Sequence, residues 1–221
     1  MKWIVITSPK FLQGEAHFIP RLFAHGVDLL HLRKPGASIE ECSQLLDKIP
    51  QEWHNRIVLH SHFELASTYR LHGIHLNHRC PQAPEGFNKS ISCSCHSLKE
   101  VVHNKPRMNY MFLSPIFDSI SKEGYGAAFT PEMLNDAAAN KIIDNKVIAL
   151  GGIDASHIQA LKEWHFGGAA FLGDIWNRID DKDVDNYLDY LSHLLKADNR
   201  WYGLITVPLK LLLSLVSICY Y

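Results

Sequence analysis

The sequence predicts an α/β protein, a single (β/α)8 barrel of the TIM type, from three observations. Apolar segments of strand length alternate with amphipathic segments of helix length, which is typical of parallel strands joined by helices. The second such strand runs through Leu29–Arg33 and ends in an inward-facing charge. Glycine pairs follow the seventh strand and flank the eighth, where barrels of this class commonly bind phosphate.

The expected strands share short runs of mostly apolar residues between turn signals. They are Trp3–Thr7, Leu29–Arg33, Arg56–Leu59, Gly73–Leu76, Ser90–Cys95, Tyr110–Leu113, Lys146–Leu150 and Ala169–Leu172. Eight strands with right-handed crossovers most simply close on themselves. The alternative is an open doubly wound sheet, but no Gly-x-Gly-x-x-Gly turn follows the first strand, which weakens its dinucleotide-binding version.

The expected helices lie between these strands, and three of them begin at clear capping residues. Ser38, Thr130 and Asp154 precede helical stretches, and Pro131 occupies a first-turn position that tolerates proline. The helices are Glu15–His25, Ile39–Ile49, Phe63–Leu71, Leu98–His103, Pro131–Asn140, Ala155–Trp164 and Val184–Leu195. The connection 77–89 is short and rich in proline, so we expect one barrel helix to be degenerate.

Composition limits the classes of function and the compartment. The chain has 221 residues and a formal net charge of −1, so it carries no electrostatic footprint for nucleic acid. Its five cysteines are odd in number and no secretory signal precedes the first strand, so we expect free thiols and a cytoplasmic location. We expect the barrel to occupy residues 1–198.

An apolar tail, residues 199–221, does not follow the barrel pattern. It contains Pro208 and Lys210, and its apolar part barely reaches the roughly 20 residues that span a bilayer. Membrane anchoring is therefore an unfavoured alternative. We expect an appendage that the barrel does not need.

The turns after the last two strands predict a phosphate site. Gly151 and Gly152 follow the seventh strand, and Gly173 follows the eighth. Glycine allows the backbone N–H groups to approach an anion closely. Ordinary turns are the alternative, and Asp174 fits a phosphate site only if its carboxylate points away.

Cationic and hydroxyl side chains at two other strand ends suit phosphate oxygens. Arg33 offers a permanently charged, bidentate guanidinium, with a structural ion pair as the alternative. Lys34 has the opposite strand parity and is expected to point outward. Ser119, Ser121 and Lys122 alternate on a glycine-containing loop that suits pyrophosphate, although a solvated polar loop is equally compatible.

Four segments, taken in order, resemble the thiamine phosphate synthases and their relatives, the thiazole tautomerases, over roughly residues 3–195. The family's second strand typically ends Gln-Leu-Arg-Glu-Lys, and this chain has His31-Leu-Arg-Lys-Pro35. The Gly-x-Ser-x-His run of the fifth strand is matched by Ser92-Cys-Ser94-Cys-His96. The sixth strand matches through Ser114-Pro115-Ile-Phe117 and Ser119-Ile-Ser121-Lys122, and the seventh ends in Gly-Gly-Ile in both.

The resemblance implies a small-molecule phosphate substrate. A hydroxyethylthiazole phosphate would bind at Gly151, Gly152 and Gly173 and be joined to a hydroxymethylpyrimidine pyrophosphate, giving thiamine phosphate. Residues implied to hold the departing pyrophosphate are Arg33, Ser94, Ser119, Ser121 and Lys122. Stabilising the charge that develops on the leaving group supplies most of such a rate enhancement. Family members often self-associate, so a homo-oligomer is also implied.

The chain departs from the family at its metal ligands. The family binds Mg²⁺ through an Asp after the third strand and another after the fourth, where this chain has Ser61 and Cys80. The usual carboxylate ligands of Mg²⁺ are thus absent. The family's second phosphate-binding lysine is replaced by Pro35. We therefore assign no metal ligand, and transferase competence is the open question.

Three alternatives remain. A thiazole tautomerase needs no metal but needs a proton-transferring residue such as His. The tautomerases carry theirs where this chain has Pro115, and the candidates to replace it are His31, His60, His78 and His96. A second alternative is a Zn²⁺ site among His60, His62, His75, His78 and Cys80. The third is a non-catalytic protein that binds thiazole or thiamine phosphate.

Overall fold

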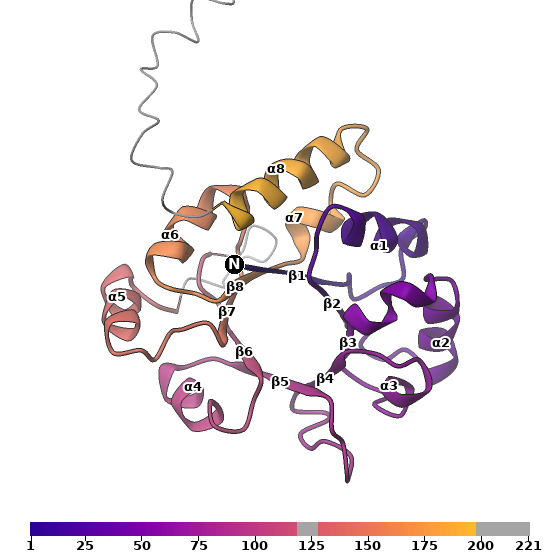
Figure 1. Cartoon of the computed structure of the whole chain (residues 1–221), viewed down its shortest axis with the longest axis horizontal. Helices are drawn as coiled ribbons and strands as arrows, with labels where there is room; N and C mark the ends of the chain where they lie inside the picture. The colour runs from indigo at the N-terminus through magenta and orange to yellow at the C-terminus, as the bar shows by residue number, and fades with distance from the viewer. Residues whose placement is uncertain (119–127, 198–221) are drawn as a thin grey trace, which may run out of the picture.

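The structure is a computed structural model that describes residues 1–118 and 128–197. Eight parallel strands pair in sequence order and close into a barrel, with the helices outside the ring of strands (Figure 1). The strands are β1 Lys2–Ile6, β2 Leu29–Leu32, β3 Ile57–Leu59, β4 Gly73–Leu76, β5 Ser90–Cys95, β6 Tyr110–Leu113, β7 Val147–Leu150 and β8 Gly168–Phe171. The predicted fold class is confirmed.

The seven expected helices are present, although α3 is shorter than predicted, and α7 and η1 are additional elements. They are α1 Glu15–Ala24, α2 Ile39–Asp47, α3 Leu65–Thr68, α4 Leu98–Asn104, α5 Pro131–Ala139, α6 Ile158–Glu163, α7 Gly173–Trp176 and α8 Val184–Lys196, with 3₁₀ turns η1 Gln51–Arg56 and η2 Ala155–His157. Ser38 and Thr130 cap α2 and α5, as predicted, through hydrogen bonds to Glu41 N and Met133 N. Residues 77–89 contain no helix, which confirms the degenerate connection.

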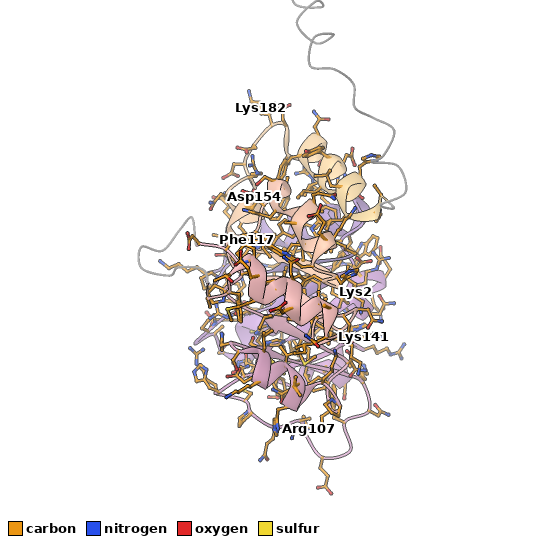
Figure 2. The ribbon with its side chains drawn as sticks, turned by 90° about the vertical axis from the view of Figure 1, so that its left-hand side faces the viewer. Lys2, Arg107, Phe117, Lys141, Asp154 and Lys182 are labelled. Atoms are coloured by element: carbon orange, nitrogen blue, oxygen red, sulfur yellow. The ribbon has the colours of Figure 1, made fainter. Side chains whose placement is uncertain are left out.

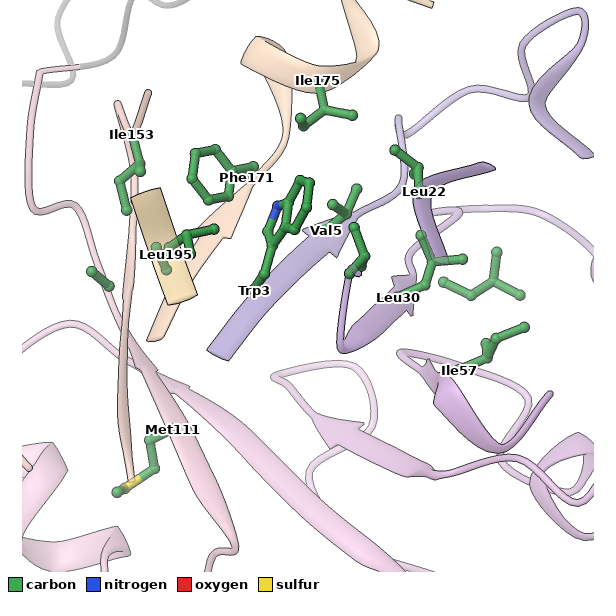
Figure 3. Close-up of a cluster of buried hydrophobic side chains, with 14 of the residues drawn as sticks. Trp3, Val5, Leu22, Leu30, Ile57, Met111, Ile153, Phe171, Ile175 and Leu195 are labelled. Carbon is green, nitrogen blue, oxygen red and sulfur yellow. The ribbon is translucent and has the colours of Figure 1, made fainter. Parts of the chain in front are cut away.

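The main hydrophobic core lies between the strands and the surrounding helices. Figure 3 shows part of it, where outward-facing Trp3 and Val5 of β1 and Phe171 of β8 pack with helical residues such as Leu22 and Ile175. Burying a large apolar side chain contributes about 1.5–3 kcal/mol. Packing of helices against the barrel wall therefore stabilises the fold.

A second core fills the barrel itself. It consists of side chains that point inward from alternate strand positions: Ile4, Ile6, Leu29, Val58, Tyr110, Phe112, Ile148 and Ala170. These side chains fill the interior, as is usual for barrels of this fold. Ligands have access to its ends, and Figure 2 shows Phe117, after β6, toward the opposite end from Lys2, the first residue of β1.

Two segments that the sequence analysis singled out, a polar loop and the apolar tail, lie outside the described residues. The loop residues Ser119, Ser121 and Lys122 fall within 119–127, and the apolar tail falls within 198–221. Within the described ranges, no helix has both the length and the apolar character needed to cross a bilayer. Cys42, Cys80, Cys93 and Cys95 are free thiols.

Candidate active site

A cavity of about 640 Å³ opens where the strands end. Its apolar lining comes from Ile6, Phe112, Leu150 and Leu172, at or just beyond the ends of β1, β6, β7 and β8. Its polar lining comes mainly from the segments after β2, β3, β4 and β5, including Arg33, Lys34, His60, Ser61, His62, His75, Asn77, His78, Arg79, Ser94 and His96. The cavity therefore lies at the barrel end where this fold places its chemistry.

Two guanidinium groups give the cavity a positive character. Arg33 is half-buried, and burial together with the charge of Arg79 lowers the pKa of its guanidinium. Among the described residues no carboxylate forms an ion pair with Arg33, and no Asp or Glu lines the cavity. The inward orientation predicted for Arg33 is therefore found, and the structural ion pair is not. Sequence reasoning did not select Arg79, which follows β4 on a strand-free segment without a distinguishing pattern.

Lys34 points away from the barrel interior but is not directed to solvent. Its side chain is fully buried and pairs with Glu15 at the start of α1. The ammonium also donates to the backbone oxygens of Ser8 and Lys10, at 3.0 and 2.9 Å. Lys34 thus ties the loop after β1 to the end of β2. Strand parity predicted its direction but not this ion pair.

Three histidines meet beneath the cavity. His31 is fully buried on β2, and its Nδ1 lies 2.9 Å from Nε2 of His60, which follows β3. The other nitrogen of His31 lies 2.7 Å from the hydroxyl of Tyr110. His60 and His75 stack with ring centroids 4.2 Å apart. His60 and His75 line the cavity. His31, which the sequence predicted to contact the substrate, lies behind them and is not part of the lining.

Hydroxyl groups hold the ring of His75 in place. Its Nδ1 lies 2.9 Å from Ser92 Oγ, and its Nε2 lies 2.9 Å from Ser94 Oγ. Both serines belong to β5, the strand that pairs with β4. The fifth-strand run that carries the family resemblance therefore positions His75 as well as lining the cavity through Ser94.

Burial keeps this cluster uncharged. It lowers the pKa of His75 from 6.5 to about 3 and lowers the pKa values of His31 and His60 well below 6.5. Electrostatic repulsion within the cluster lowers the values for His31 and His60 further, and Arg33 contributes for His60 and His75. At neutral pH each ring is therefore a neutral imidazole with one N–H and one lone pair.

Gly151 and Gly152 have geometries that only glycine adopts easily. Their φ angles are 99° and 64°, and a Cβ on Gly152 would lie 2.3 Å from the backbone oxygen of Asp118. A Cβ on Gly151 would lie 2.9 Å from Pro115 Cα. The turn after β7 therefore packs directly against the segment after β6, which explains both glycines without reference to a ligand.

Asp174 points away from the barrel mouth. Its Oδ2 accepts a hydrogen bond of 2.5 Å from the hydroxyl of Tyr187 in α8, and its Oδ1 lies 3.5 Å from Arg178. Burial and this carboxylate raise the pKa of Tyr187. Gly173 begins α7, and a Cβ there would approach only Asn177, at 3.9 Å. The carboxylate thus leaves the start of α7 unobstructed.

The remaining predicted residues are dispersed around the cavity. His96 is exposed and its Nδ1 lies 3.1 Å from the backbone oxygen of Ser114, while His78 is exposed on the segment after β4. Pro115 is half-buried beside the cavity-lining Ser114, and the peptide bond between them is cis. Lys122, Ser119 and Ser121 lie outside the described residues.

The five residues considered as zinc ligands from the sequence do not all come together in the structure. His62 bonds to the backbone oxygen of Ala37 at 2.9 Å, and Cys80 turns back onto Asn77 through two backbone hydrogen bonds. The imidazoles that do come together are His31, His60 and His75. His31 was missing from that set because the set was drawn only from the ends of the third and fourth strands, and His31 lies on the second.

The cavity does not fit the Mg²⁺ that the family resemblance implies. Ser61 lines it, but the part of the lining that the structure describes offers no carboxylate. Magnesium is usually held by one or two carboxylates together with substrate phosphates.

Solved structures and sequence relatives that resemble this chain include thiamine phosphate synthases, which are also called thiamine phosphate pyrophosphorylases. The structure resembles thiamine phosphate pyrophosphorylase from Bacteroides thetaiotaomicron, with 41% identity and a TM-score of 0.80, covering 90% of this chain and 100% of that one. A thiamine-phosphate synthase from Latilactobacillus sakei is 28% identical over 180 residues, 73% of this chain and 79% of that protein. A thiamine phosphate pyrophosphorylase from Pyrococcus furiosus shares the fold at 18% identity, with a TM-score of 0.70 over 88% of this chain and 95% of that one.

The family model described as thiamine monophosphate synthase matches residues 3–175, which include all eight strands except the first residue of β1 and every described residue of the cavity lining. The chain therefore belongs to the thiamine monophosphate synthase family, and this membership supports a role in thiamine biosynthesis.

Proposed function

We propose that the protein binds hydroxyethylthiazole phosphate and hydroxymethylpyrimidine pyrophosphate in this cavity and joins them into thiamine phosphate and pyrophosphate. The observation that carries the proposal is the presence of two cationic side chains, Arg33 and Arg79, in a cavity whose described lining has no carboxylate. Arg33 is half-buried and Arg79 is exposed at the cavity rim, and guanidinium groups without acidic partners in the cavity lining favour a multiply charged anion. A pyrophosphate group meets that requirement.

The proposed reaction breaks one bond and forms another. The C–O bond between the pyrimidine methylene and pyrophosphate breaks, and its electron pair leaves with the pyrophosphate oxygen. The thiazole nitrogen then gives its lone pair to the methylene cation, forming the new C–N bond. Arg33 stabilises the charge that accumulates on the departing oxygen, and Ser94 also lines the cavity. Ser119, Ser121 and Lys122 are proposed to assist on the family pattern.

The apolar lining suits the aromatic rings of both substrates. Phe112, Leu150 and Leu172 lie at the end of the barrel interior and line the cavity. An apolar wall excludes water, which would otherwise capture the pyrimidine cation. The thiazole phosphate is proposed to lie against the turns at Gly151, Gly152 and Gly173, where Asp174 points away.

The direct test is product formation from the two purified precursors. Thiamine phosphate is oxidised to its fluorescent thiochrome, and the reaction is run with Mg²⁺, with Zn²⁺ and with a chelator. We expect product from the wild-type chain and at least a tenfold lower kcat/KM for Arg33→Gln. A catalytically active relative serves as the assay control; if it gives product and this chain gives none under any of the three conditions, transferase activity is excluded.

A thiazole tautomerase is the second candidate, and the neutral imidazoles at the cavity favour it. His60 carries a lone pair at neutral pH and lies on the cavity surface, so it can accept a proton from the thiazole carboxylate phosphate isomer. The change in conjugation is followed by ultraviolet absorption. Isomerisation that disappears in His60→Gln, without any thiamine phosphate synthesis, favours this function. Binding of thiazole phosphate without either reaction favours a non-catalytic binder.

A further inference from the structure

The three buried imidazoles form a group that the proposed transfer of the pyrimidine to the thiazole does not use. Within residues 1–118 and 128–197, His31, His60 and His75 are the one set of three or more His, Cys, Asp or Glu side chains close enough to share a metal ion. One ligand nitrogen from each lies within 4.8 Å of the other two. The residues come from three neighbouring strands or strand ends, so the barrel wall fixes their backbones.

The spacing of the nitrogens suits a small ion after a modest adjustment. Zinc binds imidazole at about 2.0–2.1 Å in tetrahedral geometry, which sets its ligand nitrogens about 3.3 Å apart. His31 Nδ1 and His60 Nε2 lie 2.9 Å apart, so they must separate slightly, and a His75 nitrogen lies within 4.8 Å of the other two ligand nitrogens. His60 lines the cavity and has space to rotate out of its stack with His75.

The far nitrogens of two rings already have the partners that metal-bound histidines need. His31 Nε2 lies 2.7 Å from Tyr110 Oη, and His75 Nδ1 lies 2.9 Å from Ser92 Oγ. The Ser92 hydroxyl donates to the backbone oxygen of Ile74, so its oxygen accepts from His75 Nδ1–H. The lone pair of His75 is therefore on Nε2, the nitrogen beside Ser94 and the cavity. Such outer partners orient ligating imidazoles and fix their tautomers.

Metal binding at this set requires one tautomer change. The His31–His60 hydrogen bond carries a single proton between Nδ1 and Nε2. A shared ion needs a lone pair on both nitrogens, so one ring must move its proton to its other nitrogen. For His31 that nitrogen faces the Tyr110 oxygen, which is able to accept it.

We propose that His31, His60 and His75 form a binding site for Zn²⁺ or a similar divalent transition metal. Three neutral nitrogen donors without a carboxylate select such an ion over Mg²⁺. The fourth coordination position faces the cavity, on the side of Ser94 and Arg33. The positive charge of Arg33 favours an anionic fourth ligand, such as hydroxide or a phosphate oxygen. The site stands whether or not the cavity catalyses thiamine phosphate synthesis.

Metal titration of tag-free, chelator-treated protein tests the site. Zn²⁺ affinity is measured by competition with a chromophoric chelator, and Co²⁺ serves as a spectroscopic probe because its visible bands report tetrahedral coordination. The variants are His60→Gln and His75→Gln, which remove ligands, and Tyr110→Phe, which keeps all three imidazoles. The matched control is His62→Gln, because His62 lines the same cavity but bonds to Ala37 and lies outside the cluster. Circular dichroism checks that each variant is folded.

We expect one Zn²⁺ per wild-type chain and intense Co²⁺ bands. His60→Gln and His75→Gln should lose at least about 100-fold in affinity, and Tyr110→Phe about 10- to 100-fold, whereas His62→Gln should bind like the wild type. If the ligand variants fail to fold, the wild-type titration and Tyr110→Phe decide. Absence of stoichiometric Zn²⁺ binding in the wild type overturns the site. Equal loss in His62→Gln, or no loss in any cluster variant, overturns the ligand assignment.

Discussion

The ammonium of Lys34 lies 2.7 Å from Oε2 of Glu15 in the interior of the protein, and both residues are only 2% exposed. Burial raises the pKa of Glu15 and lowers the pKa of Lys34, because both charges lose hydration. Each charge is retained because the other compensates it. The pair joins α1 to the end of β2 and so fixes the backbone that presents Arg33 to the cavity.

Replacing only Lys34 should lower the free energy of unfolding more than replacing both Lys34 and Glu15. Lys34→Met leaves the Glu15 carboxylate buried and unpaired, and we expect a loss of about 3–5 kcal/mol in the free energy of unfolding. The double variant Lys34→Met, Glu15→Leu should recover most of it. Urea unfolding measures both. A double variant as unstable as the single one would show that the loss comes from packing or from the hydrogen bonds to Ser8 and Lys10.

Steric contact, in addition to backbone strain, should make Gly152 irreplaceable. Gly152 and Gly36 have φ angles of 64° and 82°, but a Cβ on Gly36 would meet nothing within 4 Å. Gly36→Ala should therefore cost only the positive-φ strain, about 1–2 kcal/mol. Gly152→Ala should cost about 1–3 kcal/mol more, because its methyl group would collide with Asp118 O. Equal losses on urea unfolding would contradict this packing of the β7 turn.

Arg33 should dominate binding of the leaving group. We expect Arg33→Gln to weaken binding of inorganic pyrophosphate about 10- to 100-fold, because a charge-assisted hydrogen bond contributes about 1.5–3 kcal/mol. Arg107→Gln removes the same charge from the loop between α4 and β6, at the other end of the strands, and should leave the affinity unchanged. Calorimetric titration measures both variants. Similar losses in the two would mean that only the net charge matters.

Metal-free protein should lose stability as the pH falls below 6.5. The pKa of His75 is about 3 in the folded protein and about 6.5 in the unfolded chain, so only the unfolded chain takes up a proton between these values. This contribution is fully present above pH 6.5 and is lost toward pH 3. At pH 5 the part that has been lost amounts to roughly 2 kcal/mol.

Comparison of unfolding at pH 7 and pH 5 checks this pH dependence. His75→Gln should show a difference between the two pH values that is about 2 kcal/mol smaller than in the wild type. Both proteins are measured in the presence of a chelator. An unchanged difference would mean that His75 is solvated in the folded protein.

The strand pattern and the capping residues predicted nearly the whole fold. All eight strands lie within one residue of their expected ends, because each is a distinct apolar run between turn signals. The predicted helix at 63–71 shrinks to Leu65–Thr68, since Arg70 adopts a positive φ and ends it. The short elements α7 and η1 were not predicted. They have too few turns to produce a helical period.

The sequence predicted which residues lie near the cavity better than it predicted their hydrogen-bond partners. Arg33, His60, His78, Ser94 and His96 were expected near the strand ends, and all of them line the cavity. The His60–His31–Tyr110 chain was not foreseen, because it depends on the register between strands far apart in sequence. Nor did the sequence indicate that Asp174 would accept a hydrogen bond from Tyr187, thirteen residues later on α8.

A crystal structure of the protein with hydroxyethylthiazole phosphate is the most direct test of the substrate assignment. We expect the phosphate at the backbone N–H groups of Gly151, Gly152 and Gly173, with the thiazole ring against Leu150 and Leu172. A phosphate bound elsewhere, or an empty barrel mouth at saturating ligand, would contradict the assignment.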